Sequence, residues 1–208
     1  MKNSALQAIQ LLIDDPGEAQ DNMDRDEQLL LQCDPVIRFY SWKEKSFSIG
    51  YFQSIVEVRK CLPRDEKLCP IVKRITGGGA VKHGNDLTFS IVLPDPAQRG
   101  FGDVRQSYYI INDMIASVIK ELDEKKEIEF YQDDFKPIFG ERKNYFCFDK
   151  PTRFDLMYQG QKIGGGAQRR PKGKFLHQGS LKIHMKMGIK LQFIQLFHQK
   201  FISLTAEV

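Results

Sequence analysis

The sequence predicts an α+β fold in which a mixed or antiparallel β-sheet is flanked by helices. Runs rich in β-branched and aromatic residues are typical of strands, and segments with apolar residues at helical spacing lie between them. The order of these segments is mixed rather than regularly alternating, which favours α+β over a doubly wound parallel sheet. At 208 residues the chain is long enough for one well-cored domain and short for two, so we expect a single domain over residues 1–208.

Four segments have the pattern of helices. Apolar residues at helical spacing over residues 5–13 predict the first. Asn22 is a candidate N-cap for a second helix through Leu31, with acidic residues near its start. Residues 104–122 carry the longest amphipathic pattern, and residues 191–201 carry the last. We therefore expect two helices before the first strand.

Strands are expected where β-branched and aromatic residues are concentrated, and Pro94 should end one of them. Residues 133–144 are the best loop candidate. The expected strands are residues 36–42, 47–50, 71–75, 87–93, 154–158 and 175–183.

The composition excludes several classes of protein. No apolar run is long enough to cross a membrane, and the N-terminus is too acidic for a secretory signal, so we expect a cytoplasmic protein without a membrane partner. A net charge of +4 is too small and too dispersed to indicate nucleic-acid binding. The four cysteines are scattered without zinc-site or disulfide-framework spacing, and the four histidines give little support for a metal site.

Two glycine clusters indicate a ligand site. Gly77, Gly78 and Gly79 follow Arg74 and precede His83; without Cβ atoms they can form a turn that presses backbone N–H groups against a ligand. A second cluster at residues 160–166 contains Lys162 and is expected to be a loop between two strands. A glycine-rich hairpin without a ligand is the alternative for either cluster alone. Two such clusters in one small domain suggest one pocket.

Several ordered sequence blocks resemble one family. They are N-M-x-x-D-E-x-L-L from Asn22, R-F-Y-x-W from Arg38, S-I-G-Y-F-Q from Ser48, R-I-T-G-G-G-A-V-x-H with D-L-T-F-S from Arg74, D-L-M-Y-x-G-x-K-I-x-G-x-A-Q-R-R from Asp155, and H-Q-G-S-L from His177. Together they span nearly all of residues 22–183 and resemble the lipoate protein ligases and octanoyltransferases, which are related to the biotin protein ligases. The resemblance implies a biotin/lipoate protein ligase-like catalytic domain. A separate C-terminal accessory domain, which many of the ligases carry, is not expected.

Cys147 is the candidate nucleophile. A lone cysteine among aromatic residues is more often a small buried apolar group. However, the run C-F-x-x-P-T-x-x-D-L ahead of K-I-x-G resembles the cysteine-dependent octanoyltransferase branch, in which this cysteine carries the acyl group as a thioester. Lys162 is the second candidate catalytic residue, because a neighbouring ammonium favours the thiolate and can bond the carbonyl oxygen as charge develops there.

The resemblance also implies an acyl-binding pocket. Asp86 could orient His83, although a separation of three residues near a turn does not require contact, and His177 is expected on a strand that borders the pocket. Arg169, Arg170, Lys172 and Lys174 form the densest basic patch, which is either a solvated hairpin turn or a docking surface for an acidic carrier protein. The expected acyl-binding residues are Arg74, Gly77, Gly78, Gly79, His83, Gly165 and Ala167.

The function implied by the resemblance is protein lipoylation. The leading hypothesis is transfer of an octanoyl group from acyl carrier protein to a lysine of a lipoyl domain of a 2-oxoacid dehydrogenase or of glycine cleavage H protein, with no cofactor. The alternative is an ATP- and Mg-dependent ligase that activates lipoate or octanoate as an acyl-adenylate. A noncatalytic acyl-binding or relay protein is the third hypothesis.

Overall fold

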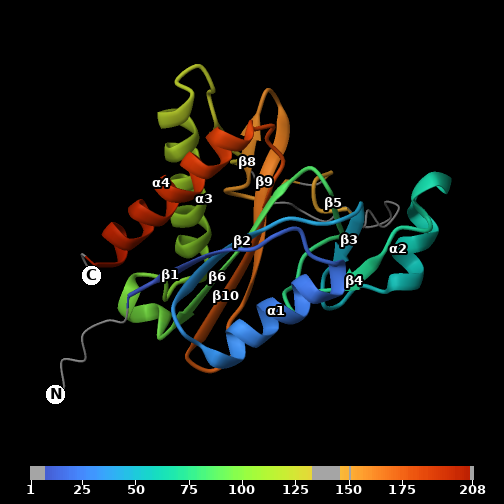
Figure 1. Ribbon diagram of the computed structural model, residues 1–208, viewed down its shortest axis with the longest axis horizontal. Coiled ribbons are helices and arrows are strands. Elements are labelled where there is room, and N and C mark those ends of the chain that lie inside the picture. Colours follow the sequence, from blue (N-terminus) through green and yellow to red (C-terminus); the bar gives the residue numbers. More distant parts are fainter. Residues whose placement is uncertain (1–7, 133–145, 150, 207–208) are drawn as a thin grey trace.

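A computed structural model describes residues 8–132, 146–149 and 151–206, which form two β-sheets and their covering helices (Figure 1). The larger sheet is mixed and seven-stranded, in the order β1 (Gln10–Ile13), β2 (Val36–Tyr40), β6 (Leu87–Pro94), β10 (Lys174–Leu181), β9 (Gln161–Arg169), β8 (Leu156–Tyr158) and β7 (Glu129–Phe130). The smaller has three strands, in the order β4 (Ile71–Lys73), β3 (Ser46–Ile49) and β5 (Val81–His83). The helices are α1 (Ala19–Gln32), α2 (Ile55–Cys61), α3 (Val104–Leu122) and α4 (Met187–Ala206), with 3₁₀ turns η1 (Arg64–Glu66) and η2 (Pro96–Arg99).

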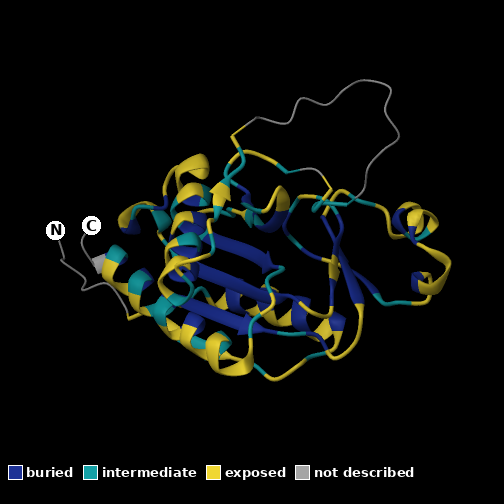
Figure 2. Ribbon diagram, turned by 90° about the horizontal axis from the view of Figure 1, so that it is seen from above, coloured by how far each residue is buried: buried dark blue, intermediate teal, exposed yellow. Residues whose placement is uncertain are grey.

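Helices cover both faces of the larger sheet, so its central strands are buried along nearly their whole length. Phe39, Phe89 and Phe175 alternate with residues of the opposite face and join the core formed by α3 and α4. Val36 and Leu176 face the other way and pack against α1. Figure 2 shows these strands as a continuous buried layer beneath largely exposed helix surfaces.

The fold class is confirmed, but the predicted first helix is wrong for the residues that the structure describes. Gln10–Ile13 forms strand β1, paired in parallel with β2, while residues 1–7 lie outside the described chain. The helical spacing of its apolar residues is overridden by backbone pairing at the sheet edge, where the Gln10 amide donates to the carbonyl of Pro35 at 2.9 Å.

The second glycine cluster is also not a loop. Residues 161–169 form β9, which pairs with β8 on one side and β10 on the other. The turn before it is the two-residue hairpin connection at Gln159 and Gly160, both with positive φ, which matches the right-handed twist of the strands. The glycines are inside a central strand, so their small size matters for side-chain approach rather than for turning the chain.

The remaining boundaries differ less. Helix α3 has the predicted bounds, whereas α1 begins at Ala19 with Glu18 as N-cap, so Asn22 is a buried residue within the helix. The strand expected at residues 71–75 ends at Lys73, and the one expected at 154–158 begins at Leu156, because Phe154 has a φ of 72°. The loop expected at 133–144 lies outside the described residues, and α2 was not anticipated.

Candidate active site

Cys147 lies where the end of the first glycine cluster meets strand β9. Its amide donates to the carbonyl of Ala80 at 2.8 Å, and Phe146 forms a bridge with the same residue. Two cavities meet at the cysteine. Gly78, Gly166 and Ala167 line both of them.

The first cavity is a wide cleft of about 500 Å³. Four charged side chains line it: Lys162 and Asp155 are buried, and Arg105 and Arg153 are exposed. The cleft is lined by Gly77, Gly78, Gly79, Arg105, Tyr108, Asn112, Phe146, Cys147, Thr152, Arg153, Phe154, Asp155, Lys162, Gly166, Ala167 and Gln168.

The second cavity is a narrow, largely apolar slot of about 40 Å³ that reaches between the two sheets. This space holds a few water molecules at most, so an eight-carbon chain can enter only if the lining side chains move apart. The slot is lined by Met23, Tyr40, Trp42, Ser48, Arg74, Gly78, Val81, His83, Thr88, Cys147, Phe148, Gly165, Gly166, Ala167, Gln178, Gly179 and Ser180.

Lys162 is held against Cys147 by a buried ion pair. Its Nζ lies 3.3 Å from Sγ and 3.1 Å from the carbonyl oxygen of Cys147, and 2.7 Å from Oδ2 of Asp155. Asp155 is fixed in turn by the amide and hydroxyl of Thr152, at 2.6 and 2.9 Å. Gly165 makes room for this pair, because a Cβ there would lie 2.5 Å from Oδ1 of Asp155.

Arg74 braces the glycine turn, which we define as Gly77, Gly78 and Gly79. Its Nη2 donates to the carbonyls of Gly77 and Gly79 at 2.7 Å each, and its Nη1 donates to the carbonyl of Ser48 at 3.0 Å. Burial lowers the pKa of Arg74 to about 10, so it remains a cation at neutral pH. The left-handed φ of 86° at Gly78 explains why the turn favours glycine. The arginine therefore both lines the slot and shapes the turn.

His83 forms a chain of hydrogen bonds in the wall of the slot. Its Nδ1 lies 2.7 Å from Oδ2 of Asp86, its Nε2 lies 2.8 Å from the hydroxyl of Ser48, and its ring stacks on Trp42 with centroids 3.9 Å apart. Burial lowers the pKa of His83 below its usual value, so the imidazole is neutral at pH 7. Burial would raise the pKa of Asp86, but the bonds from His83, Ser180 and Gly84 lower it below its usual range. The contact between His83 and Asp86, which their spacing in the sequence did not require, is present in the structure.

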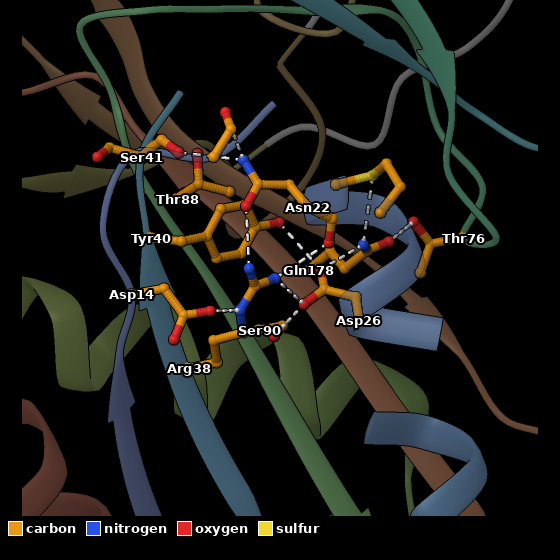
Figure 3. A network of polar contacts seen from close by, with 12 residues as sticks. Asp14, Asn22, Asp26, Arg38, Tyr40, Ser41, Thr76, Thr88, Ser90 and Gln178 are labelled. Atoms are coloured by element: carbon orange, nitrogen blue, oxygen red, sulfur yellow. Dashed lines mark hydrogen bonds and ion pairs between the residues drawn. The ribbon is translucent and has the colours of Figure 1, made fainter. Parts of the chain in front are cut away.

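A buried polar network beneath the slot was not anticipated (Figure 3). Asp26 of α1 accepts hydrogen bonds from Arg38, Tyr40, Ser90 and Gln178, at 2.7 to 2.9 Å. Gln178 lines the slot, and its Oε1 accepts a bond from Thr76, the residue before the glycine turn. The network thus ties the turn to α1 and to the central strands. The blocks that begin at Asn22, Arg38 and His177 contain its main members, and the Asp155 block contains the carboxylate partner of Lys162.

The basic patch lies at the turn between β9 and β10, and three of its four side chains donate to carbonyls of the protein itself. Arg170 donates to the carbonyl of Phe101 at 2.7 Å, and Lys174 to that of Leu31 at 2.9 Å. Arg169 donates to the carbonyl of Ile75 at 3.0 Å. His177, on β10, lies behind Gly166 and lines neither cavity described above; it packs against Phe89 and Tyr108.

The nine residues selected from the sequence all line one of the two connected cavities. Cys147, Gly78 and Ala167 line both; Gly77, Gly79 and Lys162 line the cleft; and Arg74, His83 and Gly165 line the slot. Within the described residues no group of three or more His, Cys, Asp or Glu side chains is placed to hold a metal ion. No helix in that part of the chain is long and apolar enough to span a membrane.

Comparisons with known proteins agree on one family. A family model described as the lipoyl protein ligase A/B catalytic domain matches residues 18–203. The octanoyltransferase LipM of Oceanobacillus iheyensis is 32% identical over 189 residues, which are 86% of this chain and 66% of that protein. The LipM of Bacillus subtilis is 31% identical over 171 residues, which are 79% and 61% of the two chains. The chain therefore spans slightly less than two thirds of the length of these relatives.

Solved structures share the fold at lower identity. A lipoate-protein ligase A bound with ATP has a TM-score of 0.67 and 20% identity, covering 97% of this chain and 86% of that one. A bipartite lipoate protein ligase from Thermoplasma acidophilum, described together with its E2 lipoyl domain, has a TM-score of 0.65 and 19% identity, covering 97% and 84%.

Proposed function

The chain belongs to the lipoyl protein ligase A/B catalytic domain family, and from this premise we propose that it is an acyltransferase of protein lipoylation. It transfers an octanoyl group from acyl carrier protein to the ε-amino group of a lysine on a lipoyl domain or glycine cleavage H protein. The observation that carries the proposal is the position of Cys147, at the junction of an apolar slot and a wide cleft, with the Lys162 ammonium 3.3 Å from its sulfur.

The reaction proceeds in two acyl transfers. The Cys147 thiolate attacks the donor thioester carbonyl and the donor sulfur leaves as a thiolate, which takes up a proton from water, so that the octanoyl group becomes a thioester on the enzyme. The neutral lysine amine of the acceptor then attacks this thioester; the C–S bond breaks, an amide forms, the nitrogen releases its proton to water and the Cys147 thiolate is regenerated. Both transfers pass through a tetrahedral oxyanion.

The residues around Cys147 have separate tasks in this scheme. The acyl chain occupies the slot, where each buried methylene contributes about 0.8 kcal/mol. Lys162 stabilises negative charge on the sulfur and on the oxyanion, and one such donor is typically worth about 3 kcal/mol. Asp155 orients the ammonium, and Arg74 holds the glycine turn at the cleft wall. Donor and acceptor reach the thioester through the cleft. The acyl exchange needs no cofactor. Cys147 must remain a free thiol, which suits a cytoplasmic enzyme because thiols are kept reduced there.

One observation favours the ligase alternative. The cleft has room for a nucleotide, and Lys162, Arg105 and Arg153 could contact phosphates there. In that reaction ATP with Mg would activate a free acid, and Cys147 would have no covalent role. The similar lipoate-protein ligase A is bound with ATP, but its identity to this chain is low enough to indicate the fold alone.

Incubation with octanoyl acyl carrier protein and an apo lipoyl domain, with and without ATP, followed by intact-mass measurement, separates the alternatives. We expect transfer without ATP, and without acceptor a single hydroxylamine-labile octanoyl adduct that maps to Cys147. Transfer of free octanoate only with ATP would indicate the ligase, and no transfer would indicate a binding protein.

Matched variants extend this test. Cys147→Ser should lose adduct formation and nearly all transfer, while Cys69→Ser, a free cysteine of similar exposure outside both cavities, should keep them. Lys162→Ala should lower the transfer rate about a hundredfold, as expected for loss of one oxyanion donor, and Lys172→Ala should have no effect. Full activity of Cys147→Ser would exclude the thioester route.

A further inference from the structure

An exposed apolar patch lies in the segment that joins β3 to α2 and in the first turn of that helix. We call it the aromatic patch and define it by Tyr51, Phe52, Ile55 and Val56. All four side chains are exposed, Phe52 by 91%, and the two rings contact each other with centroids 5.2 Å apart. The helix projects at the end of the molecule that holds the three-stranded sheet (Figure 1). A run of exposed apolar groups of this kind is typical of an interaction surface, whereas single exposed residues are ordinary.

The aromatic patch is built directly onto the wall of the cleft. The amide of Tyr51 donates to the carbonyl of Thr76 at 2.9 Å, immediately before the glycine turn. Gly50 packs so closely on the carbonyl of Gly78 that a Cβ there would overlap it. Because the glycine turn lines the cleft that contains Cys147, a molecule bound to the patch lies beside the mouth of the candidate active site.

The surroundings of the patch carry positive charge. The guanidinium of Arg169 lies 5.4 Å from the ring centroid of Tyr51. Lys73, also exposed, pairs with Ile49 at the end of the strand that leads into the patch. Arg105 and Arg153, which line the same cleft as the glycine turn, are also exposed. The exposed carboxylate of Glu57 in α2 forms an ion pair with Lys60 at 2.9 Å, which offsets its charge. Charge complementarity therefore points to an acidic partner that presents an apolar spot.

We infer that the aromatic patch docks the acidic acceptor domain that presents the reacting lysine. This inference rests on the proposed function. A lysine amine is carried on a stem of only four carbons, so the acceptor backbone must come close to the thioester. The donor thioester of an acyl carrier protein sits at the end of a much longer pantetheine arm, so that carrier does not need to touch the mouth of the cleft. The surface adjoining the mouth therefore suits the acceptor.

The test separates acceptor binding from acyl loading. Phe52→Ser and Val56→Ser remove exposed apolar groups outside both cavities, and Leu68→Ser is the matched control, since Leu68 is 96% exposed and lies outside the patch. Loading of Cys147 from octanoyl-pantetheine, followed by intact mass, should be unchanged in all three. Transfer from the loaded enzyme to an apo lipoyl domain or H protein should show an acceptor KM at least tenfold higher in Phe52→Ser, with kcat at saturation close to that of the wild type.

Direct binding provides a readout that does not depend on chemistry. The Kd of the same apo acceptor domain, measured by calorimetry, should rise about tenfold in Phe52→Ser and stay unchanged in Leu68→Ser. An unchanged Kd and KM would overturn the docking surface even if transfer occurs. Impaired loading from acyl carrier protein with normal acceptor kinetics would also overturn it and assign the patch to the donor carrier. If Phe52→Ser weakens acceptor binding but Cys147 of the wild type is never acylated, the docking surface stands and the proposed thioester chemistry is rejected.

Discussion

At the scale of single residues, the candidate site depends on where one ammonium group is held. The Lys162 side chain is 2% exposed and that of Asp155 is 7% exposed, so both charges are withdrawn from water. Taking an ion out of water is costly, and the mutual attraction of the pair offsets that cost only while both partners are present. The pair thus places each buried charge beside an opposite one and aims the Lys162 side chain at Cys147.

This reasoning predicts the stability of Asp155→Asn and Lys162→Met. Each single change should lower the free energy of unfolding by about 3 kcal/mol, because it leaves one buried charge without its partner. The double variant should lose clearly less than the sum of the two, since no uncompensated charge remains. Urea unfolding of the four proteins measures the coupling. Strict additivity would show that the ion pair does not contribute as described.

At the scale of elements, strand β9 brings the lysine to the cysteine. A strand alternates its side chains between two faces, and three successive glycines let neighbouring groups approach its backbone. Gly165 is the critical one for the chemistry, because its missing Cβ leaves room for Asp155 and for the end of the Lys162 side chain. The strand is thus shaped around the ion pair.

We therefore expect Gly165→Ala to fold and to lower the transfer rate at least tenfold. The added Cβ would lie 2.5 Å from Oδ1 of Asp155 and 3.1 Å from Nζ of Lys162, so the pair must shift away from Cys147. Gly188→Ala in α4 is the control, because a Cβ there meets nothing within 4 Å and Gly188 lines neither cavity. Single-turnover transfer from the loaded enzyme is the measurement. Normal rates in Gly165→Ala would mean that the lysine position does not limit the reaction.

Elements also show how far the sequence could predict the structure. Local sequence patterns predicted the bounds of α3 and the positions of most central strands. In these elements the spacing of apolar residues in the sequence agrees with the residues that are buried in the fold. The pattern at residues 5–13 failed because edge pairing with β2 decides that segment. The glycines of β9 predict a loop because glycine is depleted in strands, and only the three-dimensional contacts show what their small size accommodates.

At the scale of the whole molecule, the slot exists only because two sheets and α1 meet. Its walls include Met23 of α1, Ser48 of β3, Thr88 of β6 and Gln178 of β10. The bond between Thr76 and Gln178 joins residues 102 positions apart, and no local pattern can predict such a contact. The family resemblance of the ordered sequence blocks was enough to predict residues on the cavity walls. That Asp26 accepts hydrogen bonds from both Arg38 and Gln178 is seen only in the folded structure.

The pH dependence of the free energy of unfolding should reflect one buried histidine, His177. His177 is fully buried, with its Nδ1 3.3 Å from the Gln168 side chain and its Nε2 without a hydrogen-bond partner among the described residues. Burial, and secondarily the charge of Arg170, lowers the pKa of His177 to about 3. An unfolded histidine has a pKa of about 6.5. Between these values the unfolded chain binds the proton and the folded chain does not, so stability falls as pH falls below about 6.5.

His177→Phe tests this sign. The ring stacks on Phe89 at a centroid distance of 5.7 Å, so phenylalanine can keep the aromatic packing while removing the titrating group. The free energy of unfolding, measured in urea from pH 7.5 to pH 4.5, should fall less steeply in the variant, by up to about 1.4 kcal/mol per pH unit below pH 6. His83 and Asp86, whose pKa values are also lowered, maintain a residual slope of the same sign. Parallel pH curves for wild type and His177→Phe would show that His177 binds its proton equally well in the folded and the unfolded chain. That result would overturn the prediction.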